Sequence, residues 1–395
     1  MIPVTEAIEI IKRETPSLRS VHIGLADAVG RVLTEPIVAD TDLPPFDRSQ
    51  MDGFAVISKY TPGTLKLVGE SAAGRGWHKE LKPGEAVAIM TGAPVPKGAD
   101  AVQRIELTRN SDDKAVNILD ATEKGKFIIR RGAEIKKGTT IFGPGEIITE
   151  NMIAALAAFG YGKVKVTKQP RVSILGTGSE IVEITKKPGR DQIRNSNSVM
   201  LDVLSRKFGA VTTVIPNAKD EISNLRAQIK AAAKSSDILI ITGGVSVGKY
   251  DLTKLALTDL GAEIFFDKVR LKPGKPAVFA RLGNTLIFGL PGNPVSAAVT
   301  FHLFVRLAIL QMQNAAKTSP AQAFAVLGLD TRAAKERDTY LPARLSTDKL
   351  GHLIADPLKW QGSSDFIGFA RADALIVVAR GKILNKGDVA KIEYL

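Results

Sequence analysis

From residue 171 onward, short apolar runs rich in β-branched residues alternate with stretches of helical periodicity. The runs are RVSIL, VTTVI, DILIIT, AEIFF and the pair AVFA and TLIFG, with helices expected at about 196–209, 219–234 and 252–260, followed by PVSAAVTFHLFVRLAILQM. This alternation is typical of βαβ units, in which crossover helices cover a parallel sheet. Residues 169–316 are therefore predicted to form an open, mostly parallel three-layer α/β domain that binds its ligand at the carboxyl ends of the strands.

The flanking regions have a different pattern. The first residues, MIPVTEAIEIIKRE, predict an amphipathic helix, and residues 150–160 predict a short helix that ends at Gly160. Residues 45–143 consist of short strand-like pieces separated by Gly and Pro, which predicts a β-rich domain. After a Pro/Ala-rich passage, residues 320–395 return to short strands and are expected to form a small β-barrel or sandwich.

The composition excludes some kinds of site and favours a class of ligand. The chain has no cysteine, which excludes disulfides and thiolate metal sites, and its four histidines lack any zinc-ligand spacing. The net charge of +13 favours an anionic partner. Only 6% of the residues are aromatic and the lysines are dispersed, so a small anionic molecule is favoured over nucleic acid. The alternative is a basic surface that is merely solvated.

Location is inferred from absent signals. The N-terminal pattern lacks the layout of a signal peptide, and no stretch is expected to supply the ~20 apolar residues of a membrane span. We therefore expect no membrane partner. Together with the absence of cysteine, this favours a cytoplasmic protein.

The stretch ITGGVSVGKYD at 241–251 resembles a P-loop, because Gly243, Gly248 and Lys249 occupy the motif's positions. The position that needs Ser or Thr for Mg²⁺ holds Tyr250, whose phenol oxygen lies too far out. A buried strand precedes the turn, and Asp251 is expected to cap the helix that follows. The turn therefore either binds an anion at a helix N-terminus or is a plain βα turn with Lys249 in solvent.

Further unusual loops are expected at the same edge of the sheet. GTGSEIV at 176–182 offers Glu180, and Ser196 and Asn197 open the helix within IRNSNSVM, where an N-cap is the simpler interpretation. DKVRLKPGKP at 267–276 lies near GLPGNPVSA at 289–297 and carries three lysines: Lys268, Lys272 and Lys275. Crowded cations at one edge are costly unless an anion neutralises them, so these loops together predict an anion site.

Eight segments occur in order along the chain: PPFDRSQMDGFAV, IMTGAPVPKGADAVQ, RRGAEI, GTGSEIV, IRNSNS, TGGVSVGKYD, LKPGKP and GLPGNPVSA. Together they resemble the molybdopterin molybdenumtransferase family, which includes the C-terminal domain of gephyrin. The resemblance covers nearly the whole chain. It implies a linker domain at 1–44 with 144–168, the β-rich domain at 45–143, an α/β molybdopterin-binding domain at 169–316 and a C-terminal β-barrel at 320–395.

The resemblance also implies a reaction. Members act as homodimers with a cleft formed by the α/β domain of one subunit and the second domain of the other. Adenylylated molybdopterin is cleaved with the help of Mg²⁺, molybdate is inserted into the dithiolene, and AMP is released. Molybdate is a hard oxyanion that suits Lys, Arg, hydroxyl and backbone donors, while Mg²⁺ requires oxygen ligands. A molybdopterin adenylyltransferase and acceptor molybdoenzymes are implied as partners.

The family's functional positions carry over residue by residue. Catalytic roles are implied for Asp52, Thr91, Glu134, Glu180, Asp220, Asp251, Lys268 and Lys272. Substrate binding is implied for Arg130, Gly178, Ser179, Ser196, Asn197, Gly243, Gly244, Ser246, Gly248, Lys275, Pro291, Gly292, Asn293 and Ser363. Metal binding is implied for Glu180, Asp220 and Asp251.

Two positions depart from the family pattern. Glu134 in RRGAEI stands where Asp is expected, preceded by Ala133, and keeps the charge with a longer reach. Asn195 stands where Asp is common, a change that is tolerable if Ser196 and Asn197 make the contacts.

Two other functions are weighed against this one. Molybdopterin adenylyltransferases resemble only the α/β domain, so the β-rich remainder argues against that activity. A non-catalytic pterin-binding scaffold is expected to carry a long linker and a fused second domain, and neither is seen in this sequence.

Overall fold

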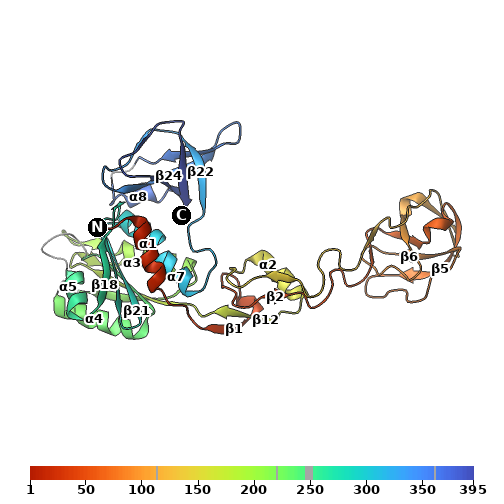
Figure 1. Ribbon diagram of the computed structural model, residues 1–395, viewed down its shortest axis with the longest axis horizontal. Helices are drawn as coiled ribbons and strands as arrows, with labels where there is room; N and C mark the ends of the chain where they lie inside the picture. Colours follow the sequence, from red (N-terminus) through yellow and green to blue (C-terminus); the bar gives the residue numbers. More distant parts are fainter. Residues whose placement is uncertain (113, 219–220, 245–251, 360–361) are drawn as a thin grey trace. The chain divides into compact units, whose positions relative to one another are not determined.

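The computed structural model describes the chain except for residues 113, 219–220, 245–251 and 360–361 (Figure 1). The chain divides into two compact units. Unit 1 comprises Met1–Glu35, Pro144–Glu150 and Lys163–Leu395, and unit 2 comprises Pro36–Gly143 and Asn151–Gly162. The four-domain boundaries given above are finer than this division and stay a prediction.

The centre of unit 1 is a six-stranded sheet in the order β16-β13-β17-β21-β20-β18. The first four strands are parallel, β20 runs antiparallel to β21, and β18 antiparallel to β20. Their bounds are Val211–Ala218 for β16, Arg171–Thr177 for β13, Ile238–Thr242 for β17, Thr285–Leu290 for β21, Pro276–Leu282 for β20 and Glu263–Lys268 for β18. Strands β17 and β21 are buried at every position, as expected for a sheet covered on both faces.

Helices cover both faces of this sheet (Figure 1). One core cluster joins alternate strand residues such as Ile240 and Phe288 to helices α1, α3, α6 and α7. The other joins Leu239 and Ile287 to α4 and α5. The helices are α1 (Val4–Glu14), α3 (Ser196–Lys207), α4 (Ile222–Ser235), α5 (Leu252–Asp259), α6 (Pro294–Thr300) and α7 (Arg306–Met312). The predicted mostly parallel, three-layer α/β domain is confirmed.

A π-helical turn, Phe301–Val305, joins α6 and α7 into one helical run, Pro294–Met312. By length and composition this run could cross a membrane, so the expectation that no stretch approaches a span was too strict. Within the protein 89% of it is buried, which accounts for its apolar composition.

His302 lies within this buried run. It is 6% exposed and packs edge-on against the rings of Phe208 and Phe301. Burial, with smaller effects from Arg306 and Lys207, lowers the pKa of His302 from 6.5 to about 4. The imidazole is therefore neutral in the folded protein near neutral pH.

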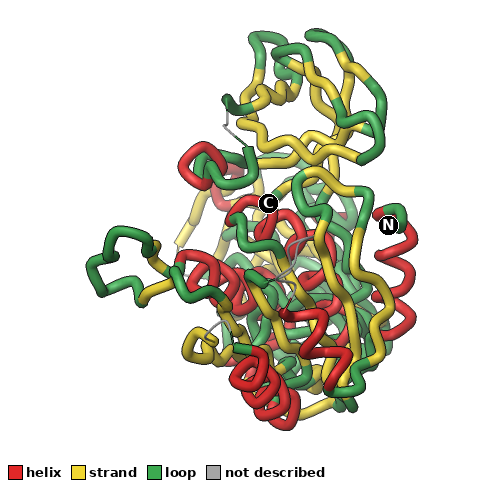
Figure 2. Tube along the Cα trace, turned by 90° about the vertical axis from the view of Figure 1, so that its left-hand side faces the viewer, coloured by secondary structure: helices red, strands yellow, loops and turns green. Residues whose placement is uncertain are grey.

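The C-terminal part of unit 1 is a closed five-stranded β-barrel, whose strands are yellow in Figure 2. The strands are β22 (Gln322–Leu327), β24 (Asp338–Thr347), β25 (Leu353–Pro357), β26 (Ala374–Val378) and β28 (Val389–Tyr394). Pairing of β24 with β26 closes the ring. Alternate residues such as Ala343, Ile376 and Ile392 fill the interior. Of the two architectures left open for this region, the barrel is confirmed.

Smaller elements complete unit 1. Strand β1 (Ser20–Gly24) pairs antiparallel with β12 (Lys163–Thr167) along its full length. The others are the 3-10 helix η1 (Leu25–Asp27), β14 (Ile181–Val182), β15 (Ile193–Arg194), β19 (Leu271–Lys272), β23 (Thr331–Arg332), β27 (Ile383–Leu384) and α8 (Phe366–Phe369).

Unit 2 is β-rich, as predicted, and contains a six-stranded sheet in the order β7-β4-β6-β5-β9-β8. Its strands are β4 (Gly53–Val56), β5 (Gly63–Ser71), β6 (Glu85–Ile89), β7 (Ala101–Arg104), β8 (Thr108–Asp112) and β9 (Ala115–Ile118). The remaining elements are β2 (Ile37–Val38), β3 (Arg48–Ser49), β10 (Ile128–Ile129), β11 (Thr140–Phe142), η2 (Ser58–Tyr60), η3 (Ile105–Leu107) and most of α2 (Glu150–Ala158).

Gly53 begins β4 for a steric reason. A Cβ at this position would lie 2.0 Å from the carbonyl oxygen of Gln103 on β7, so only glycine allows the two strands to pair there.

Candidate functional site

A pocket of about 1550 Å³ opens at the carboxyl ends of β13, β17 and β21. This is the edge at which open α/β sheets bind their ligands. Its polar and glycine lining includes Thr177, Gly178, Glu180, Asn195, Ser196, Asn197, Thr242, Gly243, Gly244, Gly292, Asn293 and Ser364. Its apolar lining includes Ile181, Ile184, Pro188, Ile193, Leu252, Pro276, Pro291 and Phe366.

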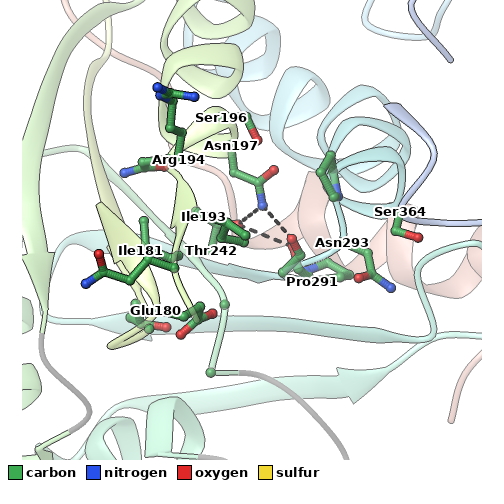
Figure 3. Close-up of a pocket in the computed structure, with 18 of the residues that line it drawn as sticks. Glu180, Ile181, Ile193, Arg194, Ser196, Asn197, Thr242, Pro291, Asn293 and Ser364 are labelled. Atoms are coloured by element: carbon green, nitrogen blue, oxygen red, sulfur yellow. Dashed lines mark hydrogen bonds between the residues drawn. The ribbon is translucent and has the colours of Figure 1, made fainter. Parts of the chain in front are cut away.

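Asn197 holds the floor of the pocket together (Figure 3). Its side chain is buried, and its Nδ2 donates to Thr242 Oγ1 at 3.0 Å and to the carbonyl of Gly292 at 2.8 Å. Thr242 Oγ1 donates in turn to the carbonyl of Pro291 at 3.3 Å. Asn197 thereby fixes the start of α3 against the ends of β17 and β21.

Two buried oxygens at this floor lack a hydrogen-bond partner within the described part of the chain. They are Oδ1 of Asn197 and Oγ1 of Thr177. An unpaired buried polar atom costs free energy, about 1–3 kcal/mol. Both residues line the pocket, and the two oxygens themselves lie buried just beneath its surface.

Glycines bring the backbone close to the pocket. A Cβ at Gly243 would lie 2.4 Å from the carbonyl oxygen of Thr177. A Cβ at Gly178 would lie 2.5 Å from the carboxylate of Glu180, which folds back over this residue. Glu180 is exposed and lines the pocket, so its carboxylate is available to a ligand or cation.

Helix α3 begins at Ser196, as predicted, but its N-cap is Asn195. The Asn195 side chain accepts a hydrogen bond from the N–H of Ser198 at 3.0 Å. The interpretation of Ser196 or Asn197 as the cap was therefore wrong. Three cap-forming residue types occur in a row here, and the sequence does not rank them.

Residues 363–366, between barrel strands β25 and β26, reach the same pocket. Asn293 Nδ2 donates to Ser363 Oγ at 2.8 Å, and the N–H of Val295 donates to the carbonyl of Ser363 at 3.1 Å. The next residue, Ser364, lines the pocket with Phe366. Ser363 thus lies beside Asn293, as their shared predicted role requires.

The three predicted lysines lie at the same edge of the sheet, between the last residue of β18 and the start of β20. Lys272 is in β19, which pairs in parallel with barrel strand β24, whereas Lys268 ends β18 and Lys275 precedes Pro276. Pro276 lines the pocket but these lysines are not among its lining residues. Their roles stay a prediction.

Several predicted residues lie outside the described residues: Asp220, Ser246, Gly248 and Asp251. Lys249 and Tyr250 of the P-loop-like turn lie outside them as well. Among the residues that are described, there is no group of three His, Cys, Asp or Glu side chains that could hold a metal ion.

Ser179 lies in unit 1 between Gly178 and Glu180, is exposed and is not among the lining residues of the pocket. Unit 2 contains the other four predicted residues, Asp52, Thr91, Arg130 and Glu134. Asp52 Oδ1 accepts a hydrogen bond from the N–H of Thr91 at 2.7 Å. Glu134 forms an ion pair with Arg48 at 2.7 Å. Asp52 and Thr91 therefore lie side by side, and Glu134 has an arginine partner suited to its longer side chain.

Arg130 pairs with Asp47 at 2.6 Å. Burial raises the pKa of the Asp47 carboxyl, but the N–H of Arg131 and the guanidinium of Arg130 outweigh it, so the pKa is lowered. The carboxylate is accordingly ionised at neutral pH and keeps Arg130 in place.

Sequence reasoning missed part of the pocket. Thr177 and Thr242 end buried strands and read as ordinary strand residues. The apolar wall formed by Ile181, Ile184 and Ile193 was also missed, because it lies in a polar segment without periodicity.

The fold and pocket define a multidomain protein with a ligand pocket at the carboxyl edge of its α/β domain, and three family models match it. They are the MoeA N-terminal region (domain I and II) at residues 2–160, a probable molybdopterin binding domain at 173–311, and the MoeA C-terminal region (domain IV) at 325–395.

Relatives that match nearly the whole chain identify the family more specifically than these models of its parts. The chain is 33% identical to the molybdopterin molybdenumtransferase of Staphylococcus aureus (strain COL), covering 100% of this chain and 98% of that protein. It is 34% identical to that of Bacillus subtilis (strain 168), covering 96% and 90%. A crystal structure of the molybdopterin biosynthesis moeA protein from Pyrococcus horikoshii OT3 superposes with a TM-score of 0.86 at 27% identity, covering 100% of both chains.

The chain therefore belongs to the molybdopterin molybdenumtransferase family, and the predicted resemblance is confirmed. It is a transferase of molybdenum cofactor biosynthesis.

Proposed function

We propose that the protein inserts molybdate into adenylylated molybdopterin and releases AMP, forming molybdenum cofactor. The observation that carries the proposal is the pocket at the carboxyl ends of β13, β17 and β21, which combines glycine backbone and polar side chains on its floor with an apolar wall. Pterin rings are flat and carry amino and ring N–H donors, which suit a pocket with a polar floor and an apolar wall. The relatives named above are molybdopterin molybdenumtransferases, which supports the same substrate.

The described residues supply binding and orientation. Asn197 and the backbone at Gly243 and Gly292 would hold a flat, polar ring system on the floor, and the apolar wall would exclude water from its face. Lys268, Lys272 and Lys275 would stabilise the phosphates and molybdate as anions. Lysines near a phosphoanhydride stabilise the charge that develops as AMP leaves.

Magnesium is part of the proposal, with Glu180 as a ligand. Its carboxylate is exposed in the pocket beside Gly178, and oxygen donors are the ligands that Mg²⁺ takes. Because Mg²⁺ usually binds one or two carboxylates plus phosphates, Glu180 together with Asp220 or Asp251 fits this ion. When bound, the ion would neutralise charge on the phosphates during cleavage.

We further propose a cytoplasmic homodimer, which receives its substrate from a molybdopterin adenylyltransferase and delivers its product to molybdoenzymes. These parts rest on the family resemblance. The absence of cysteine supports a reducing compartment.

The test is AMP release from adenylylated molybdopterin in Mg²⁺, with and without molybdate. Molybdate-dependent release of AMP, with molybdenum recovered on the pterin, is expected. Release without any dependence on molybdate would refute insertion, and incorporation of AMP from ATP would instead indicate an adenylyltransferase. A folded protein that binds the substrate but releases nothing would indicate a scaffold.

Asp52 provides a second test of the same proposal. We expect Asp52→Ala to lower kcat for AMP release by roughly 100-fold, which is the usual cost of losing a polar group that acts in the transition state. The fold should persist, because Asp52 is exposed and the lost bond from the Thr91 N–H to its carboxylate contributes at most about 1.5–3 kcal/mol.

Two variants separate the charge of Asp52 from its hydrogen bond. Asp52→Asn keeps an oxygen for the Thr91 N–H and should still be inactive if the charge is needed. Glu106→Gln, which removes an exposed carboxylate in η3, is the matched control and should retain activity. Wild-type turnover in Asp52→Ala would rule out the assigned role.

A further inference from the structure

Residues 181–194 form a flap along one wall of the pocket. Strands β14 and β15 pair in parallel, Ile181 with Ile193 and Val182 with Arg194. Ile181 and Ile193 lie next to each other in Figure 3, and both line the pocket. The side chain of Ile193 is nonetheless 60% exposed, so its burial against the protein is slight. The position of this flap therefore sets the width of the pocket, and apolar packing alone does not fix it.

A chain of three hydrogen bonds connects the flap to helix α3. The N–H of Ser198 donates to Asn195 Oδ1 at 3.0 Å, and Asn195 Nδ2 donates to Asn217 Oδ1 at 2.7 Å. Asn217 Nδ2 then donates to the carbonyl of Ile181 at 3.4 Å. Asn217 lies in β16, so these hydrogen bonds join the helix, the edge strand of the sheet and the flap.

The donor and acceptor roles in this series of hydrogen bonds are fixed by the groups at its two ends. The Ser198 N–H can only donate, and the Ile181 carbonyl can only accept. Asn195 must therefore turn its oxygen to Ser198 and its NH2 to Asn217, and Asn217 must turn its NH2 to the flap. A carboxylate at either position has no NH2 group with which to donate the next hydrogen bond. In this protein, where the two partners are Asn195 and Asn217, a carboxylate therefore cannot replace either amide.

The backbone beneath the two amides leaves room for them. A Cβ at Gly176, near the end of β13, would lie 2.6 Å from Asn217 Oδ1 and 3.2 Å from Asn195 Nδ2. Any other residue at 176 would push the amides apart. The amide pair is thus built into the sheet edge as well as into the two loops.

We propose that Asn195 and Asn217 are positioning residues whose amides latch the flap against the pocket. The bond to Ile181 is the longest of the three, and it acts beside a backbone bond from the N–H of Asn195 to the carbonyl of Val182 at 2.9 Å. A latched flap holds the apolar wall at the spacing that a flat ring system requires. The effect on substrate affinity rests on the proposed function, whereas the latch itself does not.

Two amide-to-acid variants test the latch. Asn195→Asp keeps an acceptor for Ser198 but makes Asn217 turn over, which points an oxygen at the Ile181 carbonyl. Asn217→Asp keeps the bond from Asn195 and also points an oxygen at that carbonyl. Both leave the cap of α3 in place, so the fold should persist, and Asn217→Asp carries the test if Asn195→Asp fails to fold.

Trypsin provides a direct readout, because the flap contains Lys186 and Arg190. We expect cleavage after these residues, followed by mass spectrometry, to be about fivefold faster in both variants, the factor that ~1 kcal/mol of lost latch energy gives. Asn224→Asp is the matched control, because it adds the same charge on α4 and keeps its acceptor for Gln228. Unchanged rates in both variants, or equal acceleration in the control, would overturn the latch.

Steady-state AMP release tests the positioning role. KM for adenylylated molybdopterin should rise about fivefold in both variants, with kcat within about twofold of wild type. Faster proteolysis with an unchanged KM would show that the variants release the flap but that the flap does not position the substrate, which would overturn the positioning role. If the wild-type protein releases no AMP, the proposed function fails, and the proteolysis rates still decide the latch.

Discussion

Replacing Glu180 by glutamine is expected to reduce kcat/KM for molybdate-dependent AMP release by roughly 100-fold, or about 3 kcal/mol of transition-state stabilisation. The side chain keeps its size and loses only its charge, and the carboxylate is exposed in the pocket. The melting temperature should therefore stay near that of wild type. If Glu180 binds Mg²⁺, half-maximal activity should also require more Mg²⁺. The measurement is AMP release across a series of Mg²⁺ concentrations.

Glu183→Gln is the matched control for this prediction. Glu183 lies three residues after Glu180, within the flap, and its carboxylate pairs with Lys186 at 3.3 Å. Exposed ion pairs of this kind contribute little, at most about 1 kcal/mol. Equal losses in the Glu180 and Glu183 variants would show that flap charge in general is responsible, and would remove the specific role of Glu180.

Acidification from pH 6.5 to 4 is expected to lower the free energy of unfolding by up to about 3 kcal/mol through His302 alone. The folded-state pKa of His302 is about 4, below the ordinary value of 6.5. Below pH 6.5 the unfolded chain binds a proton here that the folded protein does not. The stabilisation is therefore complete above pH 6.5 and is lost as the pH falls toward 4.

The measurement is denaturant unfolding at several pH values, for wild type and for His302→Phe. Phenylalanine keeps an aromatic ring beside Phe208 and Phe301 and cannot titrate. The variant should show a shallower loss of stability between pH 6.5 and 4, while His22→Gln, at an exposed position in β1, should keep the wild-type slope. Parallel curves for wild type and His302→Phe would contradict the prediction.

The fold of the α/β domain was predictable because its central strands, β17 and β21, are nearly continuous apolar runs. DILIIT at 237–242 can be buried on both faces only in the middle of a covered sheet, and β17 lies there. The glycine-rich loops at its carboxyl edge were predictable for the same reason. Strand ends determine where such loops gather, so Glu180, Asn197 and Asn293 were expected together, and all line one pocket.

The flap and the positions of the other site residues depend on tertiary contacts that sequence patterns do not encode. Strands β14 and β15 have two residues each, which is too short for any periodicity. The lysine-rich loop reads as a crowded anion site, but the pairing of β19 with the barrel strand β24 determines where Lys272 lies. Asn217 was missed because its role depends on a neighbour that is 22 residues away in sequence.

The division into two units has a consequence for synthesis on the ribosome. The chain passes between them at four points, after Glu35, Gly143, Glu150 and Gly162. Helix α1 packs against a core whose last helix, α7, ends at Met312, so it must wait until about 300 further residues have been made. At 5–20 residues per second this is roughly 15–60 s. During that time unit 2 can fold completely, and the apolar face of α1 is the part of the nascent chain that a chaperone would have to protect.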